Sequence, residues 1–429
     1  MASDGKIGLW PAVAIGVGGM VGGGIFAVLG LAVQLAHGGT PLAFAIAGAV
    51  ALLTAYSYVK LSLDDPGKGG TVTFLNRAFG PGPLTGALNV LLWLSYIVML
   101  SLYSYAFGSY GATFFPDSAQ GLARHALITA AVVLIAGLNL LSAQVIGRAE
   151  NWIVALKIAI LAVFVVVGVF AIDPSRLAVG EWSPVVQVAA GGMIIFLAYE
   201  GFELIANTSD DIRDPKRNLP RAYFIAVGFV VVLYVLVAAV TVGSLDVQSI
   251  VDAKDFALAE AAKPFLGQAG FTLIAVAAML STASAINATL YGSARLSYAI
   301  AKDGELPEQL ERKVWGRPVE GLLLTAAVTV VVANVLDLGS IATIGSAGFL
   351  IIFAAVNAAA ARRASHIGAR AWIAWSAAGA CTLALGALVW QTATDDPAQL
   401  WVLAGLLGIA AAVEGGFQLT EHRPLRLPI

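Results

Sequence analysis

Five glycines lie within seven residues of the first long apolar segment of this 429-residue chain, at positions 18, 19, 22, 23 and 24. The segment spans residues 11–36, which is long enough to cross a hydrocarbon core of about 30 Å. A helical glycine costs about 1 kcal/mol relative to alanine, so these residues disfavour a regular helix. Lipid cannot satisfy the backbone groups that a break releases, whereas a protein-lined cavity can. The pattern predicts a transporter whose first helix is broken at its binding site.

Composition agrees, because 59% apolar residues, 12% charged residues and a mean hydropathy of +0.86 are typical of an integral membrane protein. Apolar runs predict an all-α fold of about twelve transmembrane helices, with only short polar breaks and no soluble domain. The predicted spans are 11–36, 42–63, 84–114, 122–141, 152–172, 185–207, 222–243, 271–300, 319–336, 341–361, 372–390 and 400–417. The first is too long and too broken by glycine for a cleavable signal peptide. The lone Cys381 excludes an internal disulfide.

The placement of Lys and Arg predicts which loops face the cytoplasm. If the N-terminus lies inside, the outer loops hold only four basic residues, and the inner side collects the others that lie outside the spans. The four are Arg124, Arg176, Lys254 and Lys263. This alternation predicts a multi-pass protein of the cytoplasmic (inner) membrane with both N- and C-termini cytoplasmic. The charged segment 303–317 is expected to be a solvated cytoplasmic loop.

A second interrupted segment, residues 191–203, follows the first by five spans and carries two carboxylates at membrane depth. An odd number of spans per half makes two halves run in opposite directions, as in transporters with inverted repeats. We therefore expect a first repeat at 1–180 (helices 1–5), a second at 181–362 (helices 6–10), and helices 11 and 12 with a short cytoplasmic tail at 363–429. A broken helix offers N–H groups to a carboxylate and C=O groups to an ammonium. A zwitterionic amino acid needs both.

These segments resemble the amino acid–polyamine–organocation (APC) superfamily, whose LeuT-type fold is a 5+5 inverted repeat with broken helices 1 and 6. Residues 19–26 are similar to its first-helix signature G-x-I-x-G-S/A-G-I-F, and residues 196–203 are similar to its F-x-A-Y-x-G-F-E segment. Residues 214–221 resemble the cytoplasmic stretch that follows. The resemblance covers nearly the whole chain.

The resemblance implies a substrate site at the two breaks. The N–H groups of Gly22, Gly23 and Gly24 would face the substrate carboxylate. The carbonyls of Met20, Leu197, Ala198, Tyr199 and Glu200 would face its amine. The side-chain pocket would be shaped by Tyr199, Phe202 and residues of helices 3, 8 and 10. Gly23 stands where many members have Ser, so a side-chain hydroxyl contact to the carboxylate is absent here.

Lys157 lies in the middle of the fifth span, where an unpaired charge is costly and marks a functional site by default. The resemblance implies that it takes the place of a coupling cation between helix 1 and helix 8. Its expected partners are the carbonyls near Gly16 and Val17 and the hydroxyls of Ser281, Thr282 or Ser284. Protonation and release of Lys157 would then alternate as helix 1 moves. The alternative is a lysine that snorkels to the cytoplasmic surface.

The two carboxylates of the sixth span allow functional and structural interpretations. Glu203 is either a gating carboxylate or an acceptor for unwound backbone. Glu200 either favours an extra amine on the substrate or hydrogen-bonds a neighbouring helix. Residues 64–70 are expected either to gate the cytoplasmic side or to form an ordinary polar loop.

Other interpretations of the motifs are weaker. The glycines of residues 16–19 lack the βαβ context of a dinucleotide loop, although Gly18 and Gly22 could form a helix-packing face. The four histidines lie at loops or span ends, which argues against a histidine proton carrier and against a metal site. Nothing indicates nucleic-acid binding, a cofactor or an enzymatic nucleophile set.

The sequence therefore predicts a secondary active transporter of amino acids, coupled to protons by symport and working by alternating access. The alternatives are an exchanger of amino acids, polyamines or other organic amines, and, more remotely, a transporter-like receptor or a channel. The expected partners are the substrate, the proton as coupling ion and the lipid bilayer.

Overall fold

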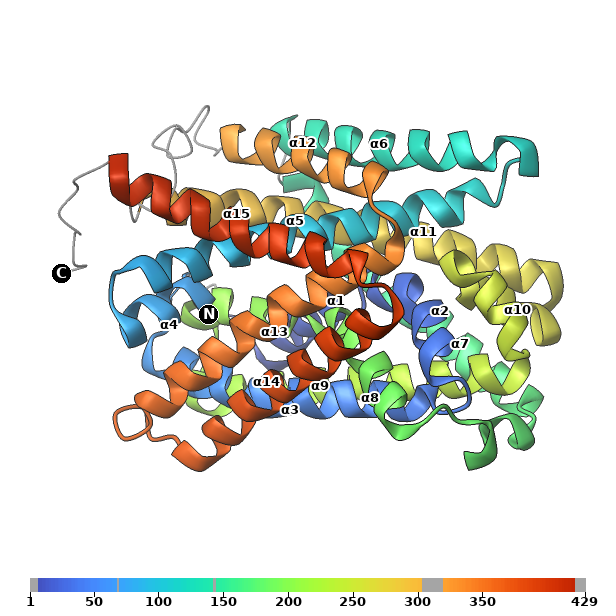
Figure 1. Ribbon diagram of the computed structural model, residues 1–429, viewed down its shortest axis with the longest axis horizontal. Coiled ribbons are helices and arrows are strands. Elements are labelled where there is room, and N and C mark those ends of the chain that lie inside the picture. The colour runs from blue at the N-terminus through green and yellow to red at the C-terminus, as the bar shows by residue number, and fades with distance from the viewer. Residues whose placement is uncertain (1–6, 68, 142–143, 303–318, 421–429) are drawn as a thin grey trace, which may run out of the picture.

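The computed structural model describes residues 7–67, 69–141, 144–302 and 319–420. Fifteen α-helices are formed there (Figure 1): α1 Leu9–Met20, α2 Gly24–Ala36, α3 Thr40–Asp64, α4 Gly70–Phe79, α5 Pro83–Ala112, α6 Asp117–Leu141, α7 Gln144–Gly168, α8 Val185–Ile194, α9 Pro215–Ser244, α10 Val247–Asp252, α11 Ala257–Lys302, α12 Val319–Val335, α13 Leu338–Arg362, α14 Ala371–Asp395 and α15 Ala398–Thr420. Short 3₁₀ helices are η1 Val169–Ala171, η2 Pro174–Leu177, η3 Val179–Glu181, η4 Phe196–Tyr199, η5 Phe202–Asp211 and η6 Lys254–Phe256. The predicted loop 303–317 lies outside the described residues.

Within the described ranges, nine helices are long and apolar enough to cross a membrane, or eleven if each of two bent helix pairs is one span. The bent pairs are α1 with α2 and α8 with the segment Phe196–Asp211. The apolar helix α12 has only 17 residues and lies where another span is expected. The all-α membrane fold is thus confirmed, whereas the count of twelve and the inverted repeat stay predictions.

Helix α5 occupies the centre of the molecule. Of its most apolar 18-residue window 89% is buried, compared with 22% for α15, which therefore offers most of its surface to lipid. Helices α6, α11, α13 and α15 pack around α5. Most helices run along the long axis of the molecule, with α4 and the C-terminal end of α15 at one end and α10 at the other (Figure 1).

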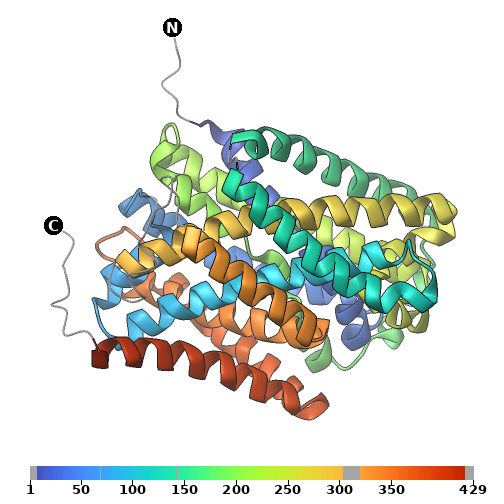
Figure 2. The same cartoon turned by 90° about the horizontal axis from the view of Figure 1, so that it is seen from above.

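Backbone-breaking residues set several helix boundaries. Prolines stand in the first turn of α3, α5 and α9, where a missing N–H costs no helical hydrogen bond. Gly267, at φ 62°, divides the long α11 into two helical parts. The described residues form no β-strand, but an isolated bridge joins Ile7 to Ile212 at the end of η5. Figure 2 shows the helices from above.

Candidate functional site

The first break separates α1 from α2 by a turn over Val21–Gly23, with a bend of 49°. The Val21 N–H still bonds to the Val17 carbonyl. The next two N–H groups, of Gly22 and Gly23, have no acceptor among the described residues. The first N–H groups of α2 have no intrahelical partners either. The start of α2 is therefore a cluster of unpaired donors in the interior, with the positive end of a helix dipole behind it.

The second break separates α8 from η4 and η5, with a bend of 52°. Gly201, at φ 116°, turns the chain between the two 3₁₀ segments, a conformation that suits glycine. The hydroxyl of Ser346, on α13, donates to the Ile194 carbonyl at 2.7 Å and accepts from the Leu197 N–H at 3.1 Å. Ser346 thus satisfies one backbone group on each side of this break.

The backbones of the two breaks are in close contact at glycine residues. A β-carbon at Gly19 would lie 2.7 Å from the Gly201 carbonyl oxygen, and one at Gly24 would lie 2.8 Å from the Ala198 Cα. Such distances leave no room for a side chain. The glycines that weaken the first helix therefore also permit it to approach the second one closely.

The residues that the sequence predicted for the substrate site are all buried around these breaks. The Met20 carbonyl accepts a hydrogen bond from the Tyr234 hydroxyl at 2.7 Å, and the Tyr199 hydroxyl donates to the Phe44 carbonyl at 2.9 Å. Phe202 belongs to an aromatic cluster with Tyr58, Phe74, Tyr223 and Phe353. Leu197 and Ala198 line the turn itself, at η4.

Glu203 accepts hydrogen bonds from the Gly201 N–H at 2.8 Å and from the Tyr96 hydroxyl at 3.0 Å. One of these two donors is a backbone N–H of the second break. Glu200 is also buried, at the C-terminal boundary of η4 and three residues before Glu203.

Lys157 is only 2% exposed, and its Nζ donates to the Gly18 carbonyl at 3.1 Å. This lysine therefore does not reach the surface. Gly18 follows the predicted partners Gly16 and Val17, which lie in α1 just before it. The hydroxyls predicted to flank Lys157 bond elsewhere. Ser281 donates to the carbonyls of Val21 and Gly22, and Thr282 donates within α11 to the Ala278 carbonyl.

Ser284 lies on the same helix and is half-buried. Sequence reasoning did not identify Tyr96, Tyr103, Tyr234 or Ser346 as residues of this region. They lie on three helices, α5, α9 and α13, and each is one of many hydroxyl residues in apolar segments. Only the packing of α5, α9 and α13 against the breaks distinguishes them.

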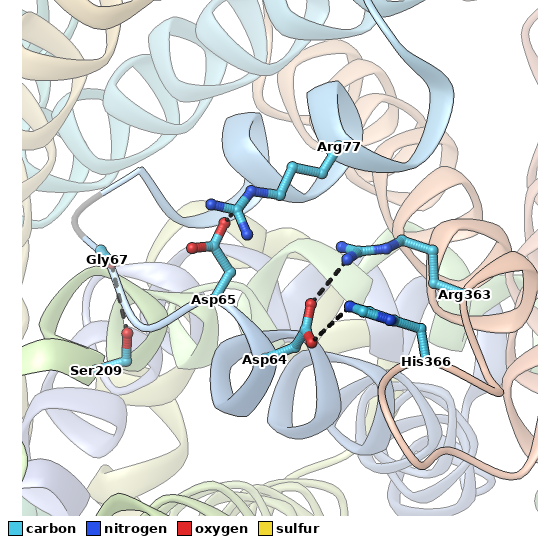
Figure 3. A network of polar contacts seen from close by, with 7 residues as sticks. All are labelled: Asp64, Asp65, Gly67, Arg77, Ser209, Arg363 and His366. Atoms are coloured by element: carbon cyan, nitrogen blue, oxygen red, sulfur yellow. Dashed lines mark hydrogen bonds and ion pairs between the residues drawn. The ribbon is translucent and has the colours of Figure 1, made fainter. Parts of the chain in front are cut away.

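A polar network lies at the C-terminal end of α3, where residues 64–70 lead into α4 (Figure 3). Asp64 binds Arg363 at 2.9 Å and approaches the His366 Nε2 to 3.5 Å, while Asp65 pairs with Arg77 at 2.8 Å. The Ser209 hydroxyl donates to the Gly67 carbonyl at 3.4 Å. Residues 64–67 thus connect α3 with α4, η5 and the segment after α13.

Residues 7–411 match the family model described as amino acid permease. An uncharacterized protein of Methanocaldococcus jannaschii is 40% identical over 356 residues, which cover 81% of this chain and 80% of the relative. The inner membrane transport protein YbaT of Escherichia coli is 34% identical, with 83% of each chain covered. A methylthioribose transporter of Bacillus subtilis is 28% identical, with 80% of this chain and 78% of the relative covered.

The family model spans nearly the whole chain, including both breaks and Lys157, and two of these relatives exceed 30% identity. The chain therefore belongs to the amino acid permease family of the APC superfamily.

Proposed function

We propose that this protein is a proton-coupled symporter of amino acids that works by alternating access. Membership of the amino acid permease family supports amino acid transport in general terms. The coupling ion, the residues that bind substrate and the direction of transport are the finer parts of the proposal. The two breaks support the substrate site, and the contact of Lys157 with Gly18 supports the proton as coupling ion.

The substrate carboxylate is proposed to bind at the start of α2. The unpaired N–H groups of Gly22 and Gly23 and the positive end of the helix dipole attract an anion there. The amine is proposed to face the carbonyls of Met20 and of residues 197–200. A carbonyl oxygen has two lone pairs, so Met20 can accept from an ammonium as well as from Tyr234.

The contact between Lys157 and Gly18 carries the proposal of proton coupling. A buried lysine is stable with its charge only where it finds acceptors, and here one acceptor belongs to the last turn of α1. Loss of its proton removes the attraction between α7 and α1. Release of the proton by Lys157 therefore favours movement of α1. Substrate bound at the end of α1 affects the same movement and so affects release of the proton.

The loops rich in Lys and Arg support an orientation with both chain ends in the cytoplasm and a location in the cytoplasmic membrane. In that orientation α4 and the network of Asp64 and Asp65 lie on the cytoplasmic side. Alternating access then requires the contacts of that side to form and break as α1 moves.

The test is uptake into proteoliposomes with a panel of labelled amino acids and amines. Uptake is measured with and without an inward proton gradient, into empty vesicles and into vesicles preloaded with substrate. We expect the gradient to drive accumulation into empty vesicles. We expect Lys157→Ala to lose this accumulation while it still binds substrate.

Lys263→Ala is the matched control, because Lys263 is a partly exposed lysine that pairs with Glu260. It should accumulate substrate as the wild type does. Uptake only into preloaded vesicles would replace symport by exchange. Gradient-driven accumulation by Lys157→Ala would refute the role of this lysine.

A further inference from the structure

Two arginines lie on the face of α9 that is turned away from the rest of the molecule. Exposed residues follow one another along this face at helical spacing, whereas the opposite face is buried. The exposed set is Arg217, Arg221, Ile225, Phe229, Val232 and Leu236. Its four apolar members form a lipid-facing stripe. The two arginines therefore stand at the end of this stripe, where the hydrocarbon core gives way to headgroups.

The two guanidinium groups can bind one anion together. Residues four positions apart lie on the same face of a helix, about 6 Å apart along its axis. Among the described residues, neither Arg217 nor Arg221 forms an ion pair. The acidic residues of this segment, Asp210, Asp211 and Asp214, all precede the helix. Arginine matches the geometry of phosphate oxygens with two parallel N–H bonds, so a phosphate group suits this pair.

Helix α1 lies beside α9 at this end. The backbone of Ile7, just before α1, bonds with the segment just before α9 at 2.8 and 2.9 Å, in a parallel bridge. Further along, a β-carbon at Gly16 would lie 3.0 Å from that of Ala226, so the two helices run side by side in the same direction. Trp10 is 70% exposed and precedes Gly16 by six residues, which places it at about the depth of Arg221. Exposed tryptophan is typical of a membrane interface.

We propose that the start of α9, together with Trp10 of α1, binds the headgroup of an anionic phospholipid. The phosphate lies between Arg217 and Arg221, and the acyl chains follow the apolar stripe of α9. A headgroup with net negative charge is preferred, because the site presents two positive charges. The lipid touches both helices, so its binding stabilises the packing of α1 on α9. The inference is independent of the substrate and of the coupling ion proposed above.

General attraction between basic loops and an anionic membrane surface is the competing explanation. Basic residues gather on the cytoplasmic side of membrane proteins in any case, and each of them attracts anionic lipid. Under that explanation the face of the helix that carries the charge does not matter. Lys216 separates the two explanations. It is an exposed neighbour of Arg217, but it stands above the buried face of α9, at helical spacing from Leu219 and Tyr223.

The experiment titrates purified, delipidated protein in detergent with phosphatidylglycerol or with phosphatidylcholine of the same acyl chains. The thermal unfolding midpoint reports binding, since a ligand that binds only the folded protein raises it, and the titration gives an apparent dissociation constant. We expect phosphatidylglycerol to raise the midpoint of the wild type clearly more than phosphatidylcholine does. Arg221→Gln should weaken binding of phosphatidylglycerol about 5-fold, and Arg217→Gln/Arg221→Gln about 30-fold.

Lys216→Gln is the matched control, because it removes the same charge from the same end of the helix. It should bind phosphatidylglycerol as the wild type does. Equal losses in Arg221→Gln and Lys216→Gln would overturn the site in favour of general attraction. Equal stabilisation by the two lipids would overturn the preference for an anionic headgroup. A rise of the same size with soluble glycerol phosphate would overturn the lipid as the occupant.

Discussion

Ser346 allows a sharp test of how the second break is held open. Its side chain is fully buried on α13, and its hydroxyl bonds the Ile194 carbonyl and the Leu197 N–H. Both groups lie where α8 ends, so neither has a regular helical partner. We predict that Ser346→Ala destabilises the protein and weakens substrate binding, because residues 197–200 depend on this hydroxyl for their position.

The size of the effect follows from the two contacts. Alanine leaves one buried carbonyl and one buried N–H unpaired, and each such group costs about 1–3 kcal/mol. The expected loss of unfolding free energy is therefore roughly 2–6 kcal/mol, reduced by whatever rearrangement the turn allows. A loss of this size is large compared with that of most single substitutions.

Ser104→Ala is the matched control for this measurement. The Ser104 hydroxyl is equally buried but donates to the Leu100 carbonyl within α5, which also has its regular helical N–H partner. Its removal should cost no more than about 1 kcal/mol. The assay is the thermal unfolding midpoint of each purified variant in the same detergent, together with the dissociation constant for a transported amino acid.

The expected result is a markedly lower midpoint for Ser346→Ala than for Ser104→Ala, with weaker substrate binding in the first variant only. Equal midpoints for the two variants would refute the argument that one hydroxyl supports both sides of the break. Normal substrate binding by a destabilised Ser346→Ala protein would refute the link to the carbonyls of residues 197–200.

Two further predictions concern the second break and the ion pairs of Asp64 and Asp65. Gly201→Ala should prevent formation of a monodisperse protein, because the alanine β-carbon would lie 2.5 Å from the backbone of Gly19 and residue 201 has a φ of 116°. The control is Gly228→Ala, which has open space around it and should behave as the wild type in size-exclusion chromatography. Monodisperse Gly201→Ala protein of normal yield would contradict this. Asp64→Asn should lower the thermal midpoint more than Asp65→Asn, because the arginine that pairs with Asp64 is 19% exposed and the one that pairs with Asp65 is 48% exposed. The reverse order would show that the pair at Asp64 does not stabilise this end of the molecule.

Much of the fold was predictable from local sequence. Apolar runs and their polar breaks located nearly all of the long helices, because a bilayer requires uninterrupted apolar helices of a known length. Both bent helix pairs lie where glycine lowers helix propensity, at residues 21–23 and near residue 195. The sequence did not assign the short segment that ends at Phe79 as a helix, and it began the eighth span at residue 271, so the first part of α11 before Gly267 was not predicted.

The sequence alone determined that this chain crosses a membrane, that its first and sixth apolar segments cannot be regular helices, and that a lysine lies at membrane depth between them. Hydropathy, helix propensity and the cost of burying a charge are properties of short segments, so a single sequence expresses them. Only the tertiary structure decided that Lys157 contacts Gly18, that Ser346 bridges the second break and that Tyr103 occupies the space beside Gly23. These partners are more than 75 residues apart in the chain, and which of many similar residues meet depends on how the helices pack.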